Sequence, residues 1–414
     1  MVLDDISTWE LLPQHRTTTR LSDDNEDGKV GSEGREITIP QVDAYRHAAC
    51  SGGIDSAQNA VAMHDARDLS IRRRDIDFSQ YNFSVSLLDQ GNMPATNQKD
   101  SGRCWMFGTL NLFRFGTRNK MHLSNFEFSE SYPYFFHLLE QSNAFLELIR
   151  ETKDRQIEDC RVLSEFLDQP LADSGDWGIA VNLIQKYGLV PKSVFPETHS
   201  SGNTESLVGF LTDRLRRVAH KIRTAPPGDA MFEQTKEATL ADIFRILSIH
   251  LGTPPTEFEW KWRDTSGKFQ STGKMSPQVF RDTYVEDLFR TYVSLIQDPR
   301  NEYYCRYTVQ YSNSVLGSND VVFLNIPADE MKSYSVAMLQ NGHPVWFACN
   351  VDAQCDFDRG VWDSNLLEYD KLYGIASPPL PLKQDRIRFG SPMGTHVMLI
   401  TGVDLDQDSG APIR

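Results

Sequence analysis

The sequence predicts an α+β protein, in which a mostly helical region precedes a strand-rich one. From about residue 104 to residue 300, apolar residues recur at helical spacing, as in the amphipathic stretch Ser129–Thr152. Beyond residue 300 the pattern changes, and strands are expected at Tyr303–Tyr311, Pro344–Val351 and His396–Val403. Helices followed by strands, rather than alternating with them, favour an α+β arrangement.

The composition is that of a globular protein and argues against two classes of partner. Of the 414 residues, 40% are hydrophobic and 24% are charged, and no run of about 18 apolar residues indicates a membrane-spanning helix. The net charge of −15 opposes a general attraction to phosphate backbones, so neither a membrane nor nucleic acid is an expected partner. The first residues lack the layout of a secretory signal, which predicts a cytoplasmic location.

The N-terminal region, residues 1–55, is predicted to be an acidic, disordered tail, because polar and acidic residues dominate it without a sustained period. At its end, Ser51–Ser56 has the pattern SGGIDS, which also occurs in loops that bind pyrophosphate ahead of a helix. Such a loop should follow a buried strand, and Asp43–Cys50 is not strand-like. We therefore interpret the pattern as a linker that caps a helix starting near Ala57.

Two shorter elements are also expected. The alternation in Asn82–Leu87 predicts a half-buried strand, and Trp177–Tyr187 predicts a helix that Gly188 and Pro191 terminate. The basic run Arg72–Arg74 is interpreted as a solvated helix face or a salt-bridge partner, given the excess of acidic residues.

The segment that carries chemistry surrounds Cys104. This cysteine follows a glycine-containing loop and opens the apolar stretch Trp105–Phe113, which places its sulfur at a helix N-terminus. The positive end of the helix dipole favours a thiolate there, and a thiolate is the form in which cysteine acts as a nucleophile. Gln98 lies six residues earlier, on the loop before the helix. Its side-chain amide could stabilise an oxyanion together with the backbone N–H of Cys104.

A nucleophilic cysteine needs a base, and His396 is the candidate. His396 is the first residue of the apolar strand expected at His396–Val403, and the backbone of that strand would hold the imidazole rigidly. The two residues are far apart in the sequence, so only the fold could bring them together. On the residues alone, a buried core histidine remains an open alternative. The ten histidines show no metal-ligand spacing, and no metal or other cofactor is expected.

The segment Asn97–Trp105 resembles the nucleophile motif of the bleomycin hydrolase and aminopeptidase C family of papain-like cysteine peptidases. The similarity extends in order through Phe126–Thr152, Asp176–Lys192 and Val345–Cys349 to Thr395-His396, and covers about residues 56–414. It implies a papain-like fold with large helical insertions. Residues 56–414 would then form one peptidase domain, with a helical lobe over about 104–300 that carries oligomerisation insertions and a strand-rich lobe over about 301–414.

The resemblance also implies roles for individual residues. Cys104 would attack the scissile carbonyl, His396 would transfer the proton and Gln98 would contribute to the oxyanion hole. Ser174 and Gly175 lie on the loop that would bind an extended peptide substrate. The family implies aminopeptidase activity on peptides, hydrolysis of bleomycin-like amides and assembly into a homohexameric ring.

Three features depart from the family pattern. No Asn follows His396 before the sequence ends at Arg414, so the asparagine of the triad and the closing C-terminal strands are expected to be missing. This leaves open the alternative of a catalytically inactive fragment or an assembly subunit of the same fold. Ser174 stands where glycine is usual, and Gly108 replaces an alanine, which should weaken the nucleophile helix by up to about 1 kcal/mol.

Overall fold

The computed structural model describes residues 35–73, 83–88, 93–226, 228–289, 291–351, 354–356, 358–391 and 394–413. The chain divides into two compact units, Met1–Phe78 with Asp356–Pro379 and Ser79–Cys355 with Leu380–Arg414. The second unit contains every residue that the sequence nominates for the active site. The sequence-based lobe boundaries near residues 55 and 300 stay predictions.

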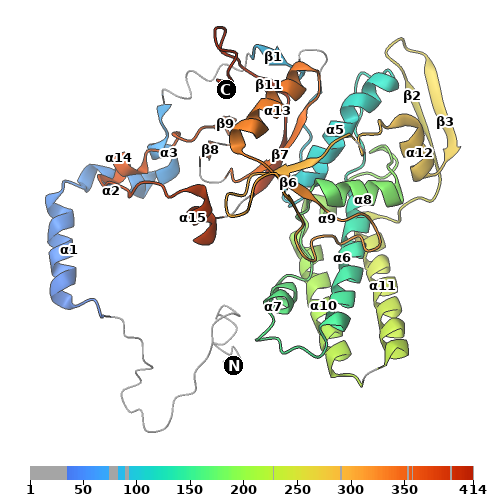
Figure 1. The fold of residues 1–414 in the computed structure, drawn as a ribbon, viewed down its shortest axis with the longest axis horizontal. Coiled ribbons are helices and arrows are strands. Elements are labelled where there is room, and N and C mark those ends of the chain that lie inside the picture. The colour runs from blue at the N-terminus through green and yellow to red at the C-terminus, as the bar shows by residue number, and fades with distance from the viewer. Residues whose placement is uncertain are drawn as a thin grey trace. The chain divides into compact units, whose positions relative to one another are not determined.

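The first unit consists of short helices and strands, beginning with an exposed helix, α1, at Ile39–Ser51 (Figure 1). No regular structure was expected there, whereas residues 1–34 of the expected tail lie outside the described residues. The helix starts with Pro40 in its first turn, and the Gln41 side chain accepts a hydrogen bond from the Thr38 N–H at 2.9 Å. The other elements are α2 (Asp55–Met63), α3 (Ala66–Ser70), β9 (Val361–Trp362) and α14 (Tyr369–Tyr373), with β8 (Cys355–Asp356) where the chain enters the unit.

The SGGIDS pattern lies between two helices. It runs from the end of α1 through a turn, with Gly53 at a φ of 72°, into α2. A pyrophosphate-binding loop requires a strand before it, whereas here the helix α1 stands in that place. The pattern thus joins two helices as a linker, but the expected cap is absent: α2 begins at Asp55 and not near Ala57, and its N-cap residue Ile54 makes no side-chain capping hydrogen bond. Arg72 forms a 3.0 Å ion pair with Glu368, in agreement with the salt-bridge interpretation of the basic run.

The second unit contains three helices that each bury a broad apolar face in its core. These are α5 (Cys104–Lys120), α6 (Ser131–Glu151) and α8 (Trp177–Tyr187). Helices α10 (Glu205–Thr224) and α11 (Asp229–Leu251) lie alongside α6 (Figure 1). The remaining helices are α7 (Arg161–Asp168), α9 (His199–Gly202), α12 (Pro277–Tyr284), α13 (Ala328–Gln340) and α15 (Lys383–Arg388).

Helix α8 has the bounds that the sequence predicts. Asp176 caps its N-terminus by accepting a hydrogen bond from the Ile179 N–H at 2.9 Å. Gly188 ends it with a φ of 79°, and a Cβ at this position would lie 2.2 Å from the carbonyl carbon of Pro277. The prediction for α6 is confirmed to within two residues at each end.

The strands form several small ladders. β7 (Val345–Cys349) pairs antiparallel with β10 (His396–Ile400), in the register that sets His396 opposite Cys349. Two of the three strands expected beyond residue 300 are thus confirmed, and only Arg306–Tyr307 of the third is a strand. The other strands are β1 (Val85–Ser86) with β11 (Gly402–Val403), β2 (Phe258–Arg263) with β3 (Phe269–Met275), and β4 (Ser294–Ile296), β5 (Arg306–Tyr307) and β6 (Phe323–Asn325).

The β2–β3 hairpin lies within the region that was expected to be helical, and it is a correction to that expectation. Its turn is closed by Asp264, which accepts hydrogen bonds from the backbone N–H groups of Ser266 and Lys268, each at 3.0 Å.

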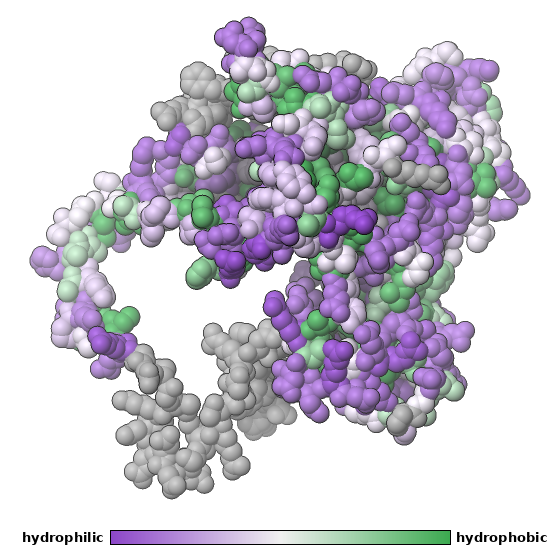
Figure 2. All heavy atoms as spheres, in the orientation of Figure 1, coloured by the Kyte–Doolittle hydropathy of each residue, from purple (hydrophilic) through white to green (hydrophobic). Residues whose placement is uncertain are grey.

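The outward faces of α10 and α11 are mostly polar. Figure 2 shows mostly hydrophilic residues with scattered hydrophobic ones over α7, α10 and α11. This pattern fits the burial of Leu207, Leu211 and Leu215 on the opposite face of α10. Within the described ranges, no helix is both long enough and apolar enough to cross a bilayer.

Candidate active site

Cys104 is the first residue of α5, directly after Arg103 as N-cap. The helix behind it is deeply buried, because Trp105, Met106 and Phe107 all belong to the core. The thiol itself is half-buried. Burial raises the pKa of the Cys104 thiol above its ordinary value, although the backbone N–H groups of Val397, Trp105 and Cys104 oppose this effect. The helix N-terminus alone therefore does not produce the thiolate that the sequence position suggests.

Helix α5 packs directly on the strand that begins with His396. A Cβ on Gly108 would lie 3.0 Å from Cγ1 of Val397 and 3.5 Å from Nε1 of Trp346. The same indole N–H donates a 3.1 Å hydrogen bond to the Thr109 hydroxyl. Gly108 is thus not only a weak point of the helix, because its missing side chain lets α5 approach β7 and β10 closely.

This packing brings the start of the nucleophile helix to the start of the histidine strand. The backbone N–H of Val397 interacts with the Cys104 thiol, and Val397 directly follows His396. His396 is half-buried at the first position of β10, and Thr395 before it donates a 2.9 Å backbone hydrogen bond to Cys349. The thiol of Cys104 and the first residues of β10, which are far apart in the sequence, therefore lie next to each other in the fold.

Gln98 lies on the loop ahead of Cys104, and its amide is used within that loop. Its Nε2 donates to the backbone carbonyl of Ser101, and the Ser101 hydroxyl donates to the backbone carbonyl of Gln98 at 2.7 Å. Lys99 between them has a φ of 52°, a left-handed conformation that is uncommon for a residue with a side chain. The loop is thus a tight, doubly hydrogen-bonded turn, with Gln98 at its start and Cys104 just beyond its end.

The loop that contains Ser174 and Gly175 is joined to this turn by Asp173. The Asp173 carboxylate accepts hydrogen bonds from the Gly102 N–H at 3.1 Å, from the Tyr134 hydroxyl and from the Thr204 hydroxyl. Its backbone carbonyl accepts one from the Trp105 indole N–H at 2.6 Å.

Gly175 lies flat against Trp105, since a Cβ there would be 2.6 Å from the indole ring, and Ser174 is exposed. Both residues named from the sequence as substrate-binding are therefore close to the nucleophile helix.

A hollow of about 560 Å³ lies beside these two loops. It is lined by the nucleophile loop, by Asp173 and by the first turns of α10: Asp100, Ser101, Gly102, Asp173, Thr204, Glu205, Val208 and Gly209. Cys104 is not part of this lining, but its sulfur lies 3.9 Å from the carbonyl oxygen of Gly102, which is part of it. A recess of this size can accept a side chain of a ligand.

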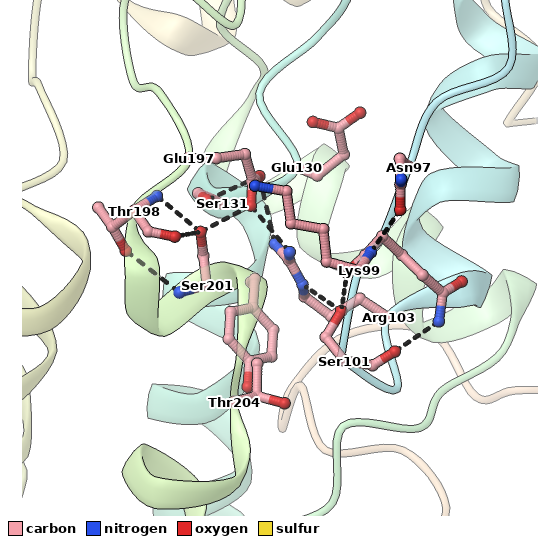
Figure 3. Close-up of polar contacts among 12 residues, drawn as sticks. Asn97, Lys99, Ser101, Arg103, Glu130, Ser131, Glu197, Thr198, Ser201 and Thr204 are labelled. Atoms are coloured by element: carbon pink, nitrogen blue, oxygen red, sulfur yellow. Dashed lines mark hydrogen bonds and ion pairs between the residues drawn. The ribbon is translucent and has the colours of Figure 1, made fainter.

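Three charged residues that sequence reasoning did not nominate shape this region: Arg103, Asp173 and Glu197. Arg103 is fully buried and forms a 2.8 Å ion pair with Glu197 (Figure 3). A charged residue at the entrance of an otherwise apolar helix is the signal that could have drawn attention to Arg103. No local pattern marks Asp173 or Glu197 as its neighbours, because both come from other parts of the chain.

Residues 36–414 match the Peptidase C1-like family. The chain belongs to this family. It is 32% identical to human bleomycin hydrolase over 364 residues, which cover 86% of this chain and 80% of that protein. It is 34% identical to aminopeptidase C of Streptococcus thermophilus over 366 residues, with the same two coverages.

Among solved structures, PepW from Lactobacillus rhamnosis HN001 is similar, with a TM-score of 0.85 and 34% identity over 91% of this chain and 84% of that one. As a member of the Peptidase C1-like family with this fold, the chain is a papain-like, cysteine-type peptidase. The fold class and the family expected from the sequence are both confirmed.

Proposed function

We propose that this peptidase is an aminopeptidase, with Cys104 as nucleophile, His396 as general base and Gln98 as a donor to the oxyanion. The observation that carries the proposal is the meeting of α5 and β10, where the N–H of Val397 reaches the Cys104 thiol one residue after His396. The names of the relatives support aminopeptidase action on peptides and hydrolysis of bleomycin-like amides.

The chemistry would proceed in two stages. His396 takes the proton of the Cys104 thiol, and the sulfur attacks the substrate carbonyl carbon to form a tetrahedral oxyanion. Gln98 and the Cys104 N–H would stabilise that oxyanion. The imidazolium then gives its proton to the leaving amine, and a thioester to Cys104 remains. Water, deprotonated by His396, attacks the thioester and releases the carboxylic acid product and the free thiol.

Burial raises the pKa of the Cys104 thiol, so the proposed nucleophile needs a nearby positive charge to ionise. We assign that role to the imidazolium of His396. Ser174 and Gly175 would bind the backbone of the substrate, and the hollow beside Gly102 would accept the side chain next to the scissile bond. A ring-shaped homo-oligomer and a cytoplasmic location stay predictions.

The deciding experiment is alkylation of the purified chain with iodoacetamide and with the epoxide inhibitor E-64 at pH 6, followed by mapping of the labelled cysteine. Rapid labelling of Cys104 that is lost in His396→Ala is expected, with a rate difference of about 100-fold. Slow labelling, spread over the six cysteines, would contradict the proposal and favour a non-catalytic assembly subunit.

The exopeptidase part needs a separate test. One peptide is compared with a free and with an acetylated amino terminus. Cleavage of the free form alone, after its first residue, supports an aminopeptidase. Equal cleavage of both forms would leave a cysteine peptidase but overturn the aminopeptidase assignment.

A further inference from the structure

Arg103 combines a full positive charge with complete burial, directly before Cys104. Its terminal nitrogens contact both carboxylate oxygens of Glu197, at 2.8 and 3.3 Å. Its guanidinium carbon lies 5.1 Å from the ring centre of Phe107 and 5.2 Å from that of Tyr134. The guanidinium is therefore fixed in position and in orientation by paired hydrogen bonds and by two aromatic rings.

The third guanidinium contact leads to Gln98. Nε of Arg103 donates to the Ser101 hydroxyl at 3.1 Å, and that hydroxyl donates to the backbone carbonyl of Gln98 at 2.7 Å. Figure 3 shows the Arg103 guanidinium between Ser101 and Glu197. The hydroxyl is thus the link between the buried arginine and the residue proposed to stabilise the oxyanion.

Glu197 is itself held by two other elements. It accepts hydrogen bonds from Ser131 at the start of α6, at 2.8 Å, and from Ser201 in α9, at 2.6 Å. Burial raises the pKa of Glu197, but hydrogen bonds and the charge of Arg103, with the two serine hydroxyls, outweigh burial and hold the pKa below its ordinary value. The carboxylate is consequently charged at neutral pH and is held by Arg103, Ser131 and Ser201, although its side chain is only partly buried.

We propose that Arg103 and Glu197 are positioning residues for the oxyanion hole, acting through Ser101 on Gln98. This inference rests on the proposed function. The anchored carboxylate fixes the guanidinium, and the guanidinium orients the Ser101 hydroxyl. That hydroxyl holds the turn from Gln98 to Cys104 in the one conformation that sets the Gln98 amide at a fixed distance from the thiol.

A structural ion pair and a positioning pair differ in what they affect. Alkylation by iodoacetamide requires only the thiolate of Cys104, whereas amide hydrolysis also requires stabilisation of the oxyanion. A pair that acts on Gln98 should therefore matter for hydrolysis and not for alkylation. A pair that only stabilises the fold should leave both rates of the folded protein unchanged.

The test uses Ser101→Ala and Glu197→Gln in the full chain, each alone and combined with Gln98→Ala. Glu147→Gln is the matched control, because Glu147 forms a comparable partly buried ion pair with Lys236 at 2.6 Å on α6 and α11. We measure kcat and KM for a peptide amide, and the rate of alkylation of Cys104 at pH 6.

Gln98→Ala is expected to lower kcat about 100-fold, as removal of an oxyanion donor does. Ser101→Ala is expected to lower kcat about tenfold, with KM and the alkylation rate unchanged. In combination with Gln98→Ala it should add no further loss, because both changes act on the same donor. Glu147→Gln should leave all three quantities unchanged.

Losses in kcat that multiply in the double variant would overturn the inference, as would an unchanged kcat in Ser101→Ala. Ser101→Ala removes a single oxygen, so it keeps the test valid if Glu197→Gln fails to fold. The proposed function fails in a different way, namely if Cys104→Ser and His396→Ala retain full hydrolysis.

Discussion

The two sides of the candidate active site are held in place very differently. On the nucleophile side, α5 is embedded in the large core, with residues such as Met106 and Phe113 completely buried. On the histidine side, His396 belongs to a two-stranded ladder. Only Val397 of β10 is buried, and no residue of β7 is.

This difference teaches that the two halves of one site respond to different perturbations. Along α5, many core contacts fix the geometry, so a substitution of a buried residue of this helix should mainly alter the free energy of unfolding. Around His396, a few contacts such as Gly108 against Val397 fix the geometry. A substitution on that side should change activity more than stability, because small displacements of a catalytic group lower the rate strongly.

The largest effect on stability is expected from Arg103→Met. The change leaves Glu197 partly buried without its cation, and loss of one partner of a buried pair destabilises by about 3–5 kcal/mol. Urea unfolding measures this difference directly. A decrease below about 1 kcal/mol would mean that the nucleophile side is not fixed by this pair.

The next effect concerns Glu130, whose carboxylate points away from the Arg103 cluster in Figure 3. Burial raises its pKa to about 7, although Lys192 at 3.4 Å opposes this. The folded protein then retains a proton that the unfolded chain loses above its ordinary pKa of 4.5. The stabilisation from this proton is complete below pH 4.5 and is lost as the pH rises through about 7.

Glu130→Gln removes this dependence. Relative to the unmodified protein, the variant should gain about 1–3 kcal/mol in unfolding free energy between pH 5 and pH 8. Parallel stability curves for the two proteins over that range would show that Glu130 ionises normally.

On the histidine side, Trp346→Phe removes the hydrogen bond to Thr109, whose hydroxyl still donates to the Trp105 carbonyl at 2.8 Å. The unfolding free energy should fall by only about 1 kcal/mol, whereas kcat/KM should fall about tenfold or more, because β7 sets the position of β10.

The control for this variant is Trp262→Phe in the β2–β3 hairpin, where the indole N–H has no hydrogen-bond partner among the described residues. It should leave kcat/KM unchanged. A loss of activity in proportion to stability, in both variants, would remove the distinction between the two sides.

The smallest effect compares one substitution in two helices. Gly209→Ala in α10 places a methyl group in open space and should raise the unfolding free energy by about 0.5–1 kcal/mol. Gly108→Ala should gain less, because its Cβ would lie 3.0 Å from Val397. An equal gain at both positions would show that β10 moves away without resistance.

Helices whose ends are determined by neighbouring residues could be predicted from the sequence. The bounds of α8 follow from an N-capping Asp176 and a terminating Gly188, both adjacent to the helix. Helix α1 was not predicted because the polar and acidic composition of residues 1–55 indicated disorder. Thr38, Pro40 and Gln41 are nevertheless typical of a helix N-terminus. The β2–β3 hairpin was not predicted because the whole region of about 104–300 was expected to be helical, and the turn at Asp264 was not recognised.

The contacts that organise the site could not be predicted in this way. Arg103 meets Glu197, 94 positions later in the chain, and Gly108 meets Val397 on a strand near the end of the sequence. Such pairs follow from tertiary packing, and no period or spacing encodes them. Cys104 and His396 were nominated because each opens a regular element, which local patterns do indicate, and because the segments around them resemble the family.

Asp173 has a consequence for anyone who wishes to redesign the specificity of this enzyme. Its carboxylate accepts a hydrogen bond from the Gly102 N–H, so any insertion, deletion or replacement at Asp173 also disturbs the turn that precedes Cys104. Any side chain at position 175 would clash with the indole of Trp105, so Gly175 cannot be replaced without moving the loop. Ser174 between them is exposed, so on the proposed function a randomised library at this single position would sample new substrate preferences while the rest of the loop keeps its shape.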